Sequence, residues 1–273
     1  MNQSVRIRLS IMMFFQFFVW GCWNVTMGTY LFNIGFDGVA VGDAYSTTSW
    51  GAIVAPIFVG MLADRFFSSQ KVMAILHLLG AGLLWYLSTI TQPGVFFWAL
   101  LIYAICYMPT LALANAIAFH QMTEPGKQFP GIRVMGTLGW IVQGLIIGIV
   151  FPKLTGASIE DTNMPIMMAA IVSLVLGIYS FTLPDTPPGN AGRKPSLSEV
   201  LGLDTIAMMK DRSFAIFILG SLLISIPLAF YYNFANAFLN ESGMENAAAK
   251  MSLGQISEAG FLVLIPFFFV RLG

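Results

Sequence analysis

Charged residues are scarce in this sequence. Only 10% of its 273 residues are Asp, Glu, Lys or Arg, whereas a soluble globular protein carries about 25%. Hydrophobic residues make up 57%, and the mean hydropathy is +0.79. The 13 basic and 13 acidic residues cancel, which argues against nucleic acid as a partner because such partners require a basic surface. The composition therefore indicates a membrane protein.

Residues that usually form disulfides or bind metals are also few. The two cysteines, Cys22 and Cys106, lie in different apolar runs and support neither a disulfide framework nor a metal site. The sequence has no G-x-S-x-G motif and no phosphate-cradling glycine loop, so nothing supports an enzyme or a cofactor. His77 lies in an apolar run without an acidic neighbour, and for it we favour packing or an interhelical hydrogen bond over proton relay.

Long apolar runs, in contrast, are abundant. A helix needs roughly 20 apolar residues to span a bilayer. Eight runs reach this length, near residues 9–33, 44–63, 70–91, 94–119, 129–151, 165–184, 213–239 and 251–270. The first follows Arg6 and Arg8 without a small-residue cleavage site, so we interpret it as a retained span and not as a signal peptide.

One long connection separates the first six runs from the last two. It contains Pro187, Pro188 and Gly189, residues that interrupt regular structure. The predicted fold is therefore an all-α membrane protein in three parts. Residues 1–184 form a six-helix transmembrane bundle, residues 185–212 form a linker, and residues 213–273 contribute two further helices.

Basic residues are unevenly distributed over the connections. If the N-terminus is cytoplasmic, the outside segments hold only Lys153 and Lys250. Cytoplasmic loops are typically enriched in Lys and Arg, so the distribution predicts a cytoplasmic N-terminus and a cytoplasmic linker. The basic residues of the inside segments are Arg6, Arg8, Arg65, Lys71, Lys127, Arg133, Arg193, Lys194, Lys210, Arg212 and Arg271.

The run at 129–151, FPGIRVMGTLGWIVQGLIIGIVF, combines spanning length with a charge. On a helix Arg133, Thr137 and Trp140 share one face, because they stand at i, i+4 and i+7. An arginine in hydrocarbon is costly and should face protein or a water-filled cavity, although an arginine that snorkels from a helix end is an equal alternative. Glycines on the remaining surface let neighbouring helices approach closely. A charge, a hydroxyl and an indole on one face favour a polar ligand with an apolar flank.

Polar residues also interrupt the seventh run. Tyr231, Tyr232, Asn233 and Asn236 follow Pro227. Asparagines inside a span normally form hydrogen bonds with another helix or with a ligand.

The eighth run contains Gln255 and Glu258, which are i, i+3 neighbours on one helical face. An apolar environment favours the uncharged form of a carboxylic acid, so Glu258 is a candidate proton carrier unless a cation such as Arg133 holds it charged. A position in the outer headgroup layer is the alternative for Glu258.

Between the second and third runs the sequence reads GMLADRF over residues 60–66. Asp64 and Arg65 form an acid–base pair in a very short turn, and such a pair can latch two helix ends together. The stretch resembles the G-x-L-A-D-R motif of the major facilitator superfamily, and we predict that Asp64 and Arg65 form a cytoplasmic gate.

The resemblance extends to a narrower family. Motifs spread from the first run to the last resemble, in order and spacing, those of the bacterial nucleoside:proton symporter family. They are WGCW at 20–23, FDG at 36–38, YMPTL at 107–111, FPGIR at 129–133, GTLGW at 136–140, LGLD at 201–204 and QISE at 255–258. The resemblance implies a proton-coupled secondary transporter of the bacterial inner membrane. It would import nucleosides by alternating access through a central cavity between two six-helix halves.

The resemblance also implies a set of cavity residues. Arg133, Thr137 and Trp140 match cavity positions on the fifth span, and Gln255 with Glu258 matches the eighth-span pair that holds the nucleoside. The seventh span departs from the pattern, because Ala229 and Tyr232 stand where glutamine and asparagine are expected. Tyr232, Asn233 or Asn236 could compensate, which leaves the base preference open. Of these, Tyr232 and Asn233 join the predicted substrate-binding set.

The number of runs is a second departure, because a complete transporter of this superfamily has two six-span halves. We interpret the chain as the N-terminal bundle plus the first two helices of the C-terminal bundle. We expect that these 273 residues alone do not transport. Two alternatives stay open: the same fold carrying a sugar or another small polar metabolite, and a non-transporting membrane ligand sensor.

Overall fold

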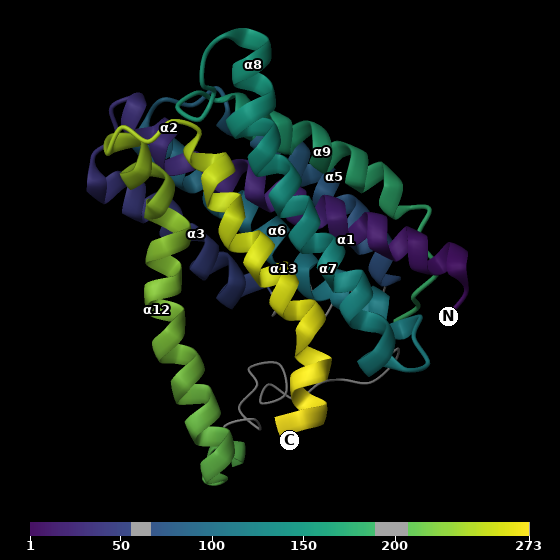
Figure 1. Ribbon diagram of the computed structural model, residues 1–273. Coiled ribbons are helices and arrows are strands. Elements are labelled where there is room, and N and C mark those ends of the chain that lie inside the picture. Colours follow the sequence, from purple (N-terminus) through teal and green to yellow (C-terminus); the bar gives the residue numbers. More distant parts are fainter. Residues whose placement is uncertain (56–66, 189–206, 273) are drawn as a thin grey trace.

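The computed structural model describes residues 1–55, 67–188 and 207–272, and within these ranges every regular element is a helix (Figure 1). The first predicted span consists of α1 (Gln3–Asn24) and α2 (Met27–Asn33). The next three are α3 (Gly38–Ala55), α5 (Ser69–Leu87) and α6 (Pro93–His120). The fifth comprises α7 (Pro125–Leu145), a π-helical turn (Ile146–Val150) and α8 (Phe151–Thr155), and the sixth is α9 (Met164–Ser180).

Two long helices follow, α12 (Arg212–Glu241) and α13 (Ala247–Leu272), after a 3₁₀ turn at Ala207–Lys210. Among the described residues, five helical segments are long and apolar enough to cross a membrane: Gln3–Asn33, Ser69–Leu87, Pro93–His120, Pro125–Thr155 and Arg212–Glu241. The remaining three predicted runs correspond to α3, to the shorter helix α9 and to α13. The chain is a multi-pass membrane protein, as its composition predicts.

The first span is interrupted, which the run of apolar residues does not indicate. α1 ends at Asn24 and α2 begins at Met27. The hydroxyl of Tyr45 in α3 bridges the break, because it donates to the carbonyl of Asn24 at 3.0 Å and accepts from the amide of Gly28 at 2.9 Å. A side chain from another helix thus satisfies backbone groups that the break leaves unpaired.

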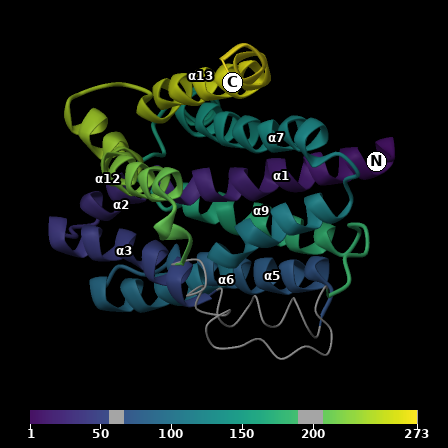
Figure 2. The ribbon, with the colours of Figure 1, turned by 90° about the horizontal axis from the view of Figure 1, so that it is seen from below.

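Helix pairs build the bundle in layers. α1 packs between α7 and α9, α5 packs against α6 and α9, and α3 packs against α6 (Figure 2). Gly139 of α7 lies against the backbone carbonyl of Phe14 in α1, where an added Cβ would have no room. The predicted close approach along the glycine-rich face of the fifth span is therefore confirmed.

A polar network crosses the middle of the bundle core. The fully buried side chain of Gln16 donates to Thr110 Oγ1 at 2.7 Å, and its Oε1 lies 2.8 Å from His77 Nε2. The other ring nitrogen of His77 lies 3.1 Å from Ser173 Oγ. The network joins α1, α5, α6 and α9, which confirms the interhelical hydrogen bond expected for His77.

The bundle has two ends. We call the end that carries the N-terminus and residues 181–188 the linker end, and the end that carries residues 33–38 and 156–163 the far end. α12 and α13 contact the bundle mainly near the far end. In α12 only Asn236 is buried, and among the α13 side chains that the structure describes the buried ones fall between Ala247 and Gln255. Towards the linker end the two helices diverge from the bundle (Figure 1).

Two predictions fall partly or wholly outside the described residues. Asp64 and Arg65 lie there, and so does most of the linker. At its start the linker is anchored to α5: Gln70 donates to Asp185 Oδ1 at 2.6 Å, and its Oε1 accepts from the Thr186 amide at 3.0 Å. The gate and the boundaries of the three parts stay predictions.

Candidate functional site

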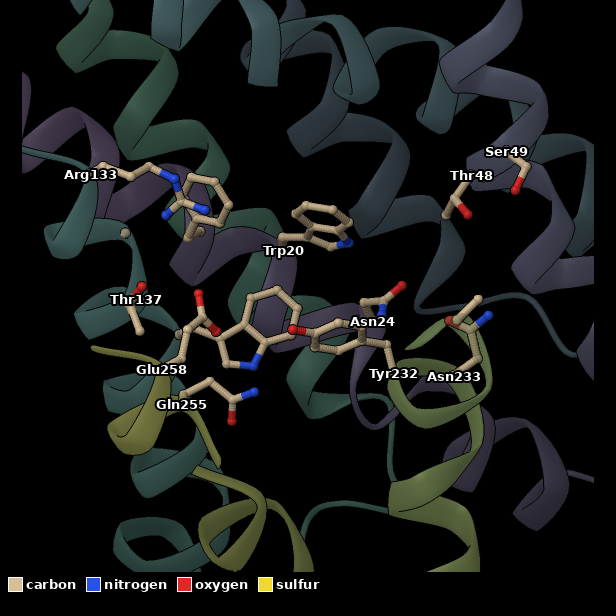
Figure 3. A pocket seen from close by; sticks show the side chains of 14 residues that line it. Trp20, Asn24, Thr48, Ser49, Arg133, Thr137, Tyr232, Asn233, Gln255 and Glu258 are labelled. Atoms are coloured by element: carbon tan, nitrogen blue, oxygen red, sulfur yellow. The ribbon is translucent and has the colours of Figure 1, made fainter. Parts of the chain in front are cut away.

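A pocket of about 280 Å³ lies where α12 and α13 meet the bundle (Figure 3). Side chains from α1, α3, α7, α12 and α13 line it. All seven predicted substrate-binding residues are among them: Arg133, Thr137, Trp140, Tyr232, Asn233, Gln255 and Glu258. Ala229, which marks the departure on the seventh span, lines the pocket as well.

Helical periodicity explains how α7 and α13 supply their side chains. Arg133, Thr137 and Trp140 stand on successive turns of α7 and reach the pocket from one face. Gln255 and Glu258 stand one turn apart on α13 and point towards the same space (Figure 3). The structure thus brings together residues that are more than a hundred positions apart in the sequence.

One side of the pocket is charged. The guanidinium carbon of Arg133 lies 4.1 Å from the ring centre of Phe17, a cation–π contact. Arg133 Nη1 is buried and has no hydrogen-bond partner among the described residues. Glu258 lies on the same side of the pocket (Figure 3), but within the described ranges the only ion pair joins Lys127 and Glu124. Both charged groups of the pocket therefore keep free capacity for a ligand or for water.

Aromatic rings from three helices form one wall. Trp20 of α1 and Trp140 of α7 have ring centres 5.7 Å apart at 70°, and Trp140 and Tyr232 of α12 have centres 5.6 Å apart at 64°. These are edge-to-face pairs, the arrangement that aromatic quadrupoles favour. The indole nitrogen of Trp20 is buried and finds no partner in the described part of the chain. The wall therefore combines flat apolar surface with an indole N–H group, that of Trp20, that has no hydrogen-bond partner in the described part of the chain.

The opposite side of the pocket carries neutral polar groups. Asn24, Thr48, Ser49 and Asn233 lie away from Arg133 and Thr137 (Figure 3). Thr48 and Ser49 are absent from the predicted set, because small hydroxyl residues give no periodic signal of their own. Asn24 does stand at helical spacing from Trp20, and that spacing could have identified it.

Asn236 does not belong to the pocket. From the sequence, Asn236 is a candidate, beside Tyr232 and Asn233, to compensate for the glutamine and asparagine that the seventh span lacks. Its side chain is fully buried nearer the far end, where it contacts Thr29 and Glu160. Among the described residues no group of three or more His, Cys, Asp or Glu side chains is placed to hold a metal ion.

Comparisons with known proteins match this chain to nucleoside transporters. A family model described as nucleoside H+ symporter matches residues 1–273. YegT of Escherichia coli is 45% identical over 267 residues, which cover 97% of this chain. Xanthosine permease and nucleoside permease NupG, both of Escherichia coli, are each 33% identical over 99% of this chain. The chain spans 62% of the length of YegT and 66% of the length of each permease.

Solved structures of the nucleoside transporter NupG share the fold. One matches 99% of this chain at 34% identity with a TM-score of 0.80, and a mutant form matches 98% at 33% identity with a TM-score of 0.85. In both cases the match covers 68% of the NupG chain. The match confirms the predicted all-α fold of the major facilitator superfamily.

Proposed function

The chain belongs to the nucleoside H+ symporter family, and we propose that the protein imports nucleosides together with protons by alternating access. The observation that carries the proposal is the single pocket in which Arg133 and Glu258, an aromatic wall and several amides and hydroxyls meet. Transport, and not an enzymatic reaction, is the activity that this pocket and the family support.

The chemistry of the pocket fits a nucleoside. A nucleoside presents a flat base, which can stack on an indole, and ribose hydroxyls and base edges, which both donate and accept hydrogen bonds. The volume of about 280 Å³ lies just below the roughly 300–1,000 Å³ range of small-molecule pockets. A buried donor without a partner costs about 1–3 kcal/mol. Arg133 Nη1 and Trp20 Nε1 are buried without a partner in the described part of the chain, so a shift of either side chain that turns this donor towards the ligand would add to the affinity.

We assign the pocket residues as follows. Trp140, with Trp20 beside it, stacks on the base. The polar groups of Arg133, Thr137, Gln255 and Glu258 bind ribose hydroxyls or the base edge. On the seventh span, Ala229 and Tyr232 stand where glutamine and asparagine are expected. The hydroxyl of Tyr232 and the amide of Asn233 supply polar contacts in place of those two missing side chains.

Glu258 is our candidate for coupling transport to protons. It is the only carboxylate that lines the pocket in the described part of the chain, and protonation would remove its charge beside Arg133. A proton that moves through 100 mV provides about 2.3 kcal/mol, enough to concentrate a neutral solute roughly fiftyfold.

The charge bias of the connections supports an orientation in the bacterial inner membrane. We propose that the N-terminus and the linker end face the cytoplasm, with Asp64 and Arg65 as a gate on that side. The far end then faces outwards. In this orientation, the packing of α12 and α13 near the far end and their divergence at the linker end support an inward-facing conformation.

Uptake of radiolabelled nucleosides tests the proposal. The full-length gene that contains this sequence is expressed in bacteria that lack their own nucleoside carriers, and uridine and adenosine uptake is followed with and without a protonophore. We expect uptake that the protonophore abolishes and that unlabelled nucleosides, but not sugars or free bases, inhibit. Absence of uptake with the protein present in the membrane would refute the proposal.

Two other results would replace it by a different function. Inhibition by a sugar, but not by nucleosides, would indicate a permease for another solute. Nucleoside-induced thermal stabilisation of the purified protein without flux into liposomes would indicate a sensor.

A further inference from the structure

Glu160 is a buried carboxylate outside the pocket. It lies in the connection between α8 and α9 at the far end, and its side chain is 1% exposed. Acidic residues are almost never fully buried unless they are paired. In the described part of the chain no lysine or arginine forms an ion pair with Glu160. Its burial therefore requires other partners.

Those partners come from the two helices that follow the linker. Glu160 Oε2 accepts hydrogen bonds from the side-chain amides of Asn236 and Asn240 in α12, at 2.8 and 3.0 Å. Glu160 Oε1 accepts from the backbone amide of Ala248 at 3.0 Å. Ala248 lies in the first turn of α13, where amide groups have no partner inside the helix and the helix dipole favours a negative charge. A carboxylate of the bundle thus caps α13 and binds α12.

A second residue of the bundle joins this cluster. The hydroxyl of Thr29 in α2 donates to Asn236 Oδ1 at 2.6 Å. Asn236 therefore accepts a hydrogen bond from α2 and donates one to Glu160. We call Thr29, Glu160, Asn236, Asn240 and Ala248 the far-end latch.

A tightly packed seam lies between the latch and the pocket. Gly144 and Gly148 of the fifth span face Ala248, Ala249 and Ser252 of α13, and an added Cβ at Gly148 would lie 2.5 Å from the Ala249 nitrogen. On α7 the pocket residues end at Trp140, before these glycines, and on α13 they begin at Gln255, after Ser252. The seam and the latch thus lie on the far-end side of the pocket.

We propose that Glu160 is a gating residue that holds the far end closed in this conformation. The pocket then opens to that side only after the three hydrogen bonds of Glu160 break. Hydrogen bonds to a charged acceptor are about twice as strong as neutral ones, so one side chain can hold both helices. When the far end opens, water solvates the released carboxylate, and this makes the latch reversible. This inference rests on the proposed function, because a gate has meaning only in a transporter that alternates.

Labelling from the far side tests the latch without measuring transport. In a background in which Cys22 and Cys106 are replaced by alanine, Ser49→Cys places a thiol in the pocket. Right-side-out membrane vesicles are treated with a membrane-impermeant maleimide, and the labelling rate is compared for Glu160→Ala, Glu160→Gln and Asp161→Ala. Asp161 is the matched control, because it is the exposed acidic neighbour in the same connection.

We expect Glu160→Ala to raise the labelling rate about tenfold, the factor that corresponds to about 1.4 kcal/mol. Glu160→Gln should raise the labelling rate less. Its amide oxygen can still accept from the backbone amide of Ala248, but its amide NH2 group faces the NH2 groups of Asn236 and Asn240 and cannot accept from them. Asp161→Ala should leave the rate unchanged. Equal rates for Glu160→Ala and Asp161→Ala would overturn the latch.

Variants that remove only part of the latch test the proposal if Glu160→Ala does not reach the membrane. Thr29→Val and Asn240→Ala each remove part of the latch and should raise the same labelling rate, and unchanged rates in both would overturn the proposal. The result also separates the latch from the proposed function. Raised labelling in a protein without nucleoside uptake would refute the function and support the latch. Proton-driven uptake with unchanged labelling would support the proposed function and refute the latch.

Discussion

Replacing Arg133 by methionine removes the charge from the pocket while keeping the length of the side chain. The guanidinium lies 4.1 Å from the Phe17 ring centre, and its Nη1 is buried without a partner in the described part of the chain. A hydrogen bond to a charged group contributes about 1.5–3 kcal/mol. The loss of one such bond to the ligand corresponds to roughly 10- to 150-fold weaker binding. We expect the Kd for uridine to rise by this factor in Arg133→Met.

Arg133→Lys should have an intermediate effect. Lysine keeps the charge but lacks the planar fork that stacks on an aromatic ring and donates in two directions. Binding is measured by isothermal titration calorimetry on the purified protein, and the melting temperature without ligand is recorded for each variant. Lys127→Met is the matched control, because it removes a charge from an exposed position at the start of the same helix. The control should bind uridine as the unchanged protein does.

Two results would refute the reasoning. If Arg133→Met binds uridine within about twofold of the unchanged protein, less than 0.5 kcal/mol separates them by the relation between affinity and free energy, and Arg133 does not contact the ligand. If Arg133→Met and Lys127→Met weaken binding equally, the effect reflects total charge and not the pocket. A lower melting temperature without weaker binding would assign Arg133 a structural role.

Three further predictions concern the other elements of the site. Trp140→Ala should weaken uridine binding by about 1–3 kcal/mol, the contribution of stacking a base on an aromatic ring, which raises the Kd roughly 5- to 150-fold. Trp140→Phe should keep most of the affinity, and calorimetry on both variants decides this. Glu258→Gln should retain nucleoside exchange but lose accumulation against a gradient, because glutamine cannot change charge, and proteoliposome assays with and without a pH gradient separate the two activities. Gly139→Leu should cost about 1–3 kcal/mol of stability, the usual range for overpacking, because its side chain would enter the backbone of α1. Gly82→Ala, which meets nothing within 4 Å, should not lower the melting temperature, because alanine favours a helix over glycine.

Much of this site follows from local sequence patterns. Spanning length and apolar composition are properties of a segment by itself, so the runs that form the helices can be read without knowing what they contact. The common face of Arg133, Thr137 and Trp140 is equally local, because the helical period fixes it. The pairing of Gln255 and Glu258 follows from the same period. In each case the placement in the pocket agrees with the pattern.

The roles of the two asparagines on α12 depended on tertiary structure. Asn233 and Asn236 are three residues apart, a spacing that puts them on neighbouring parts of one helical face. Asn233 lines the pocket, whereas Asn236 lies in the far-end latch. The difference arises from the level at which each residue meets the bundle, and helix tilt and packing set that level. No property of the α12 sequence contains this information.

The sequence by itself determined which segments are helical, which residues share a helical face, and which family the chain resembles. Only the tertiary structure decided that Thr48 and Ser49 reach the pocket and that Glu160 is buried. A carboxylate in a short connection is normally solvated, and nothing near Glu160 in the sequence predicts otherwise. Its partners lie 76 to 88 residues further along the chain. Periodicity describes neighbours within one helix, whereas contacts between distant helices depend on how all of them pack together.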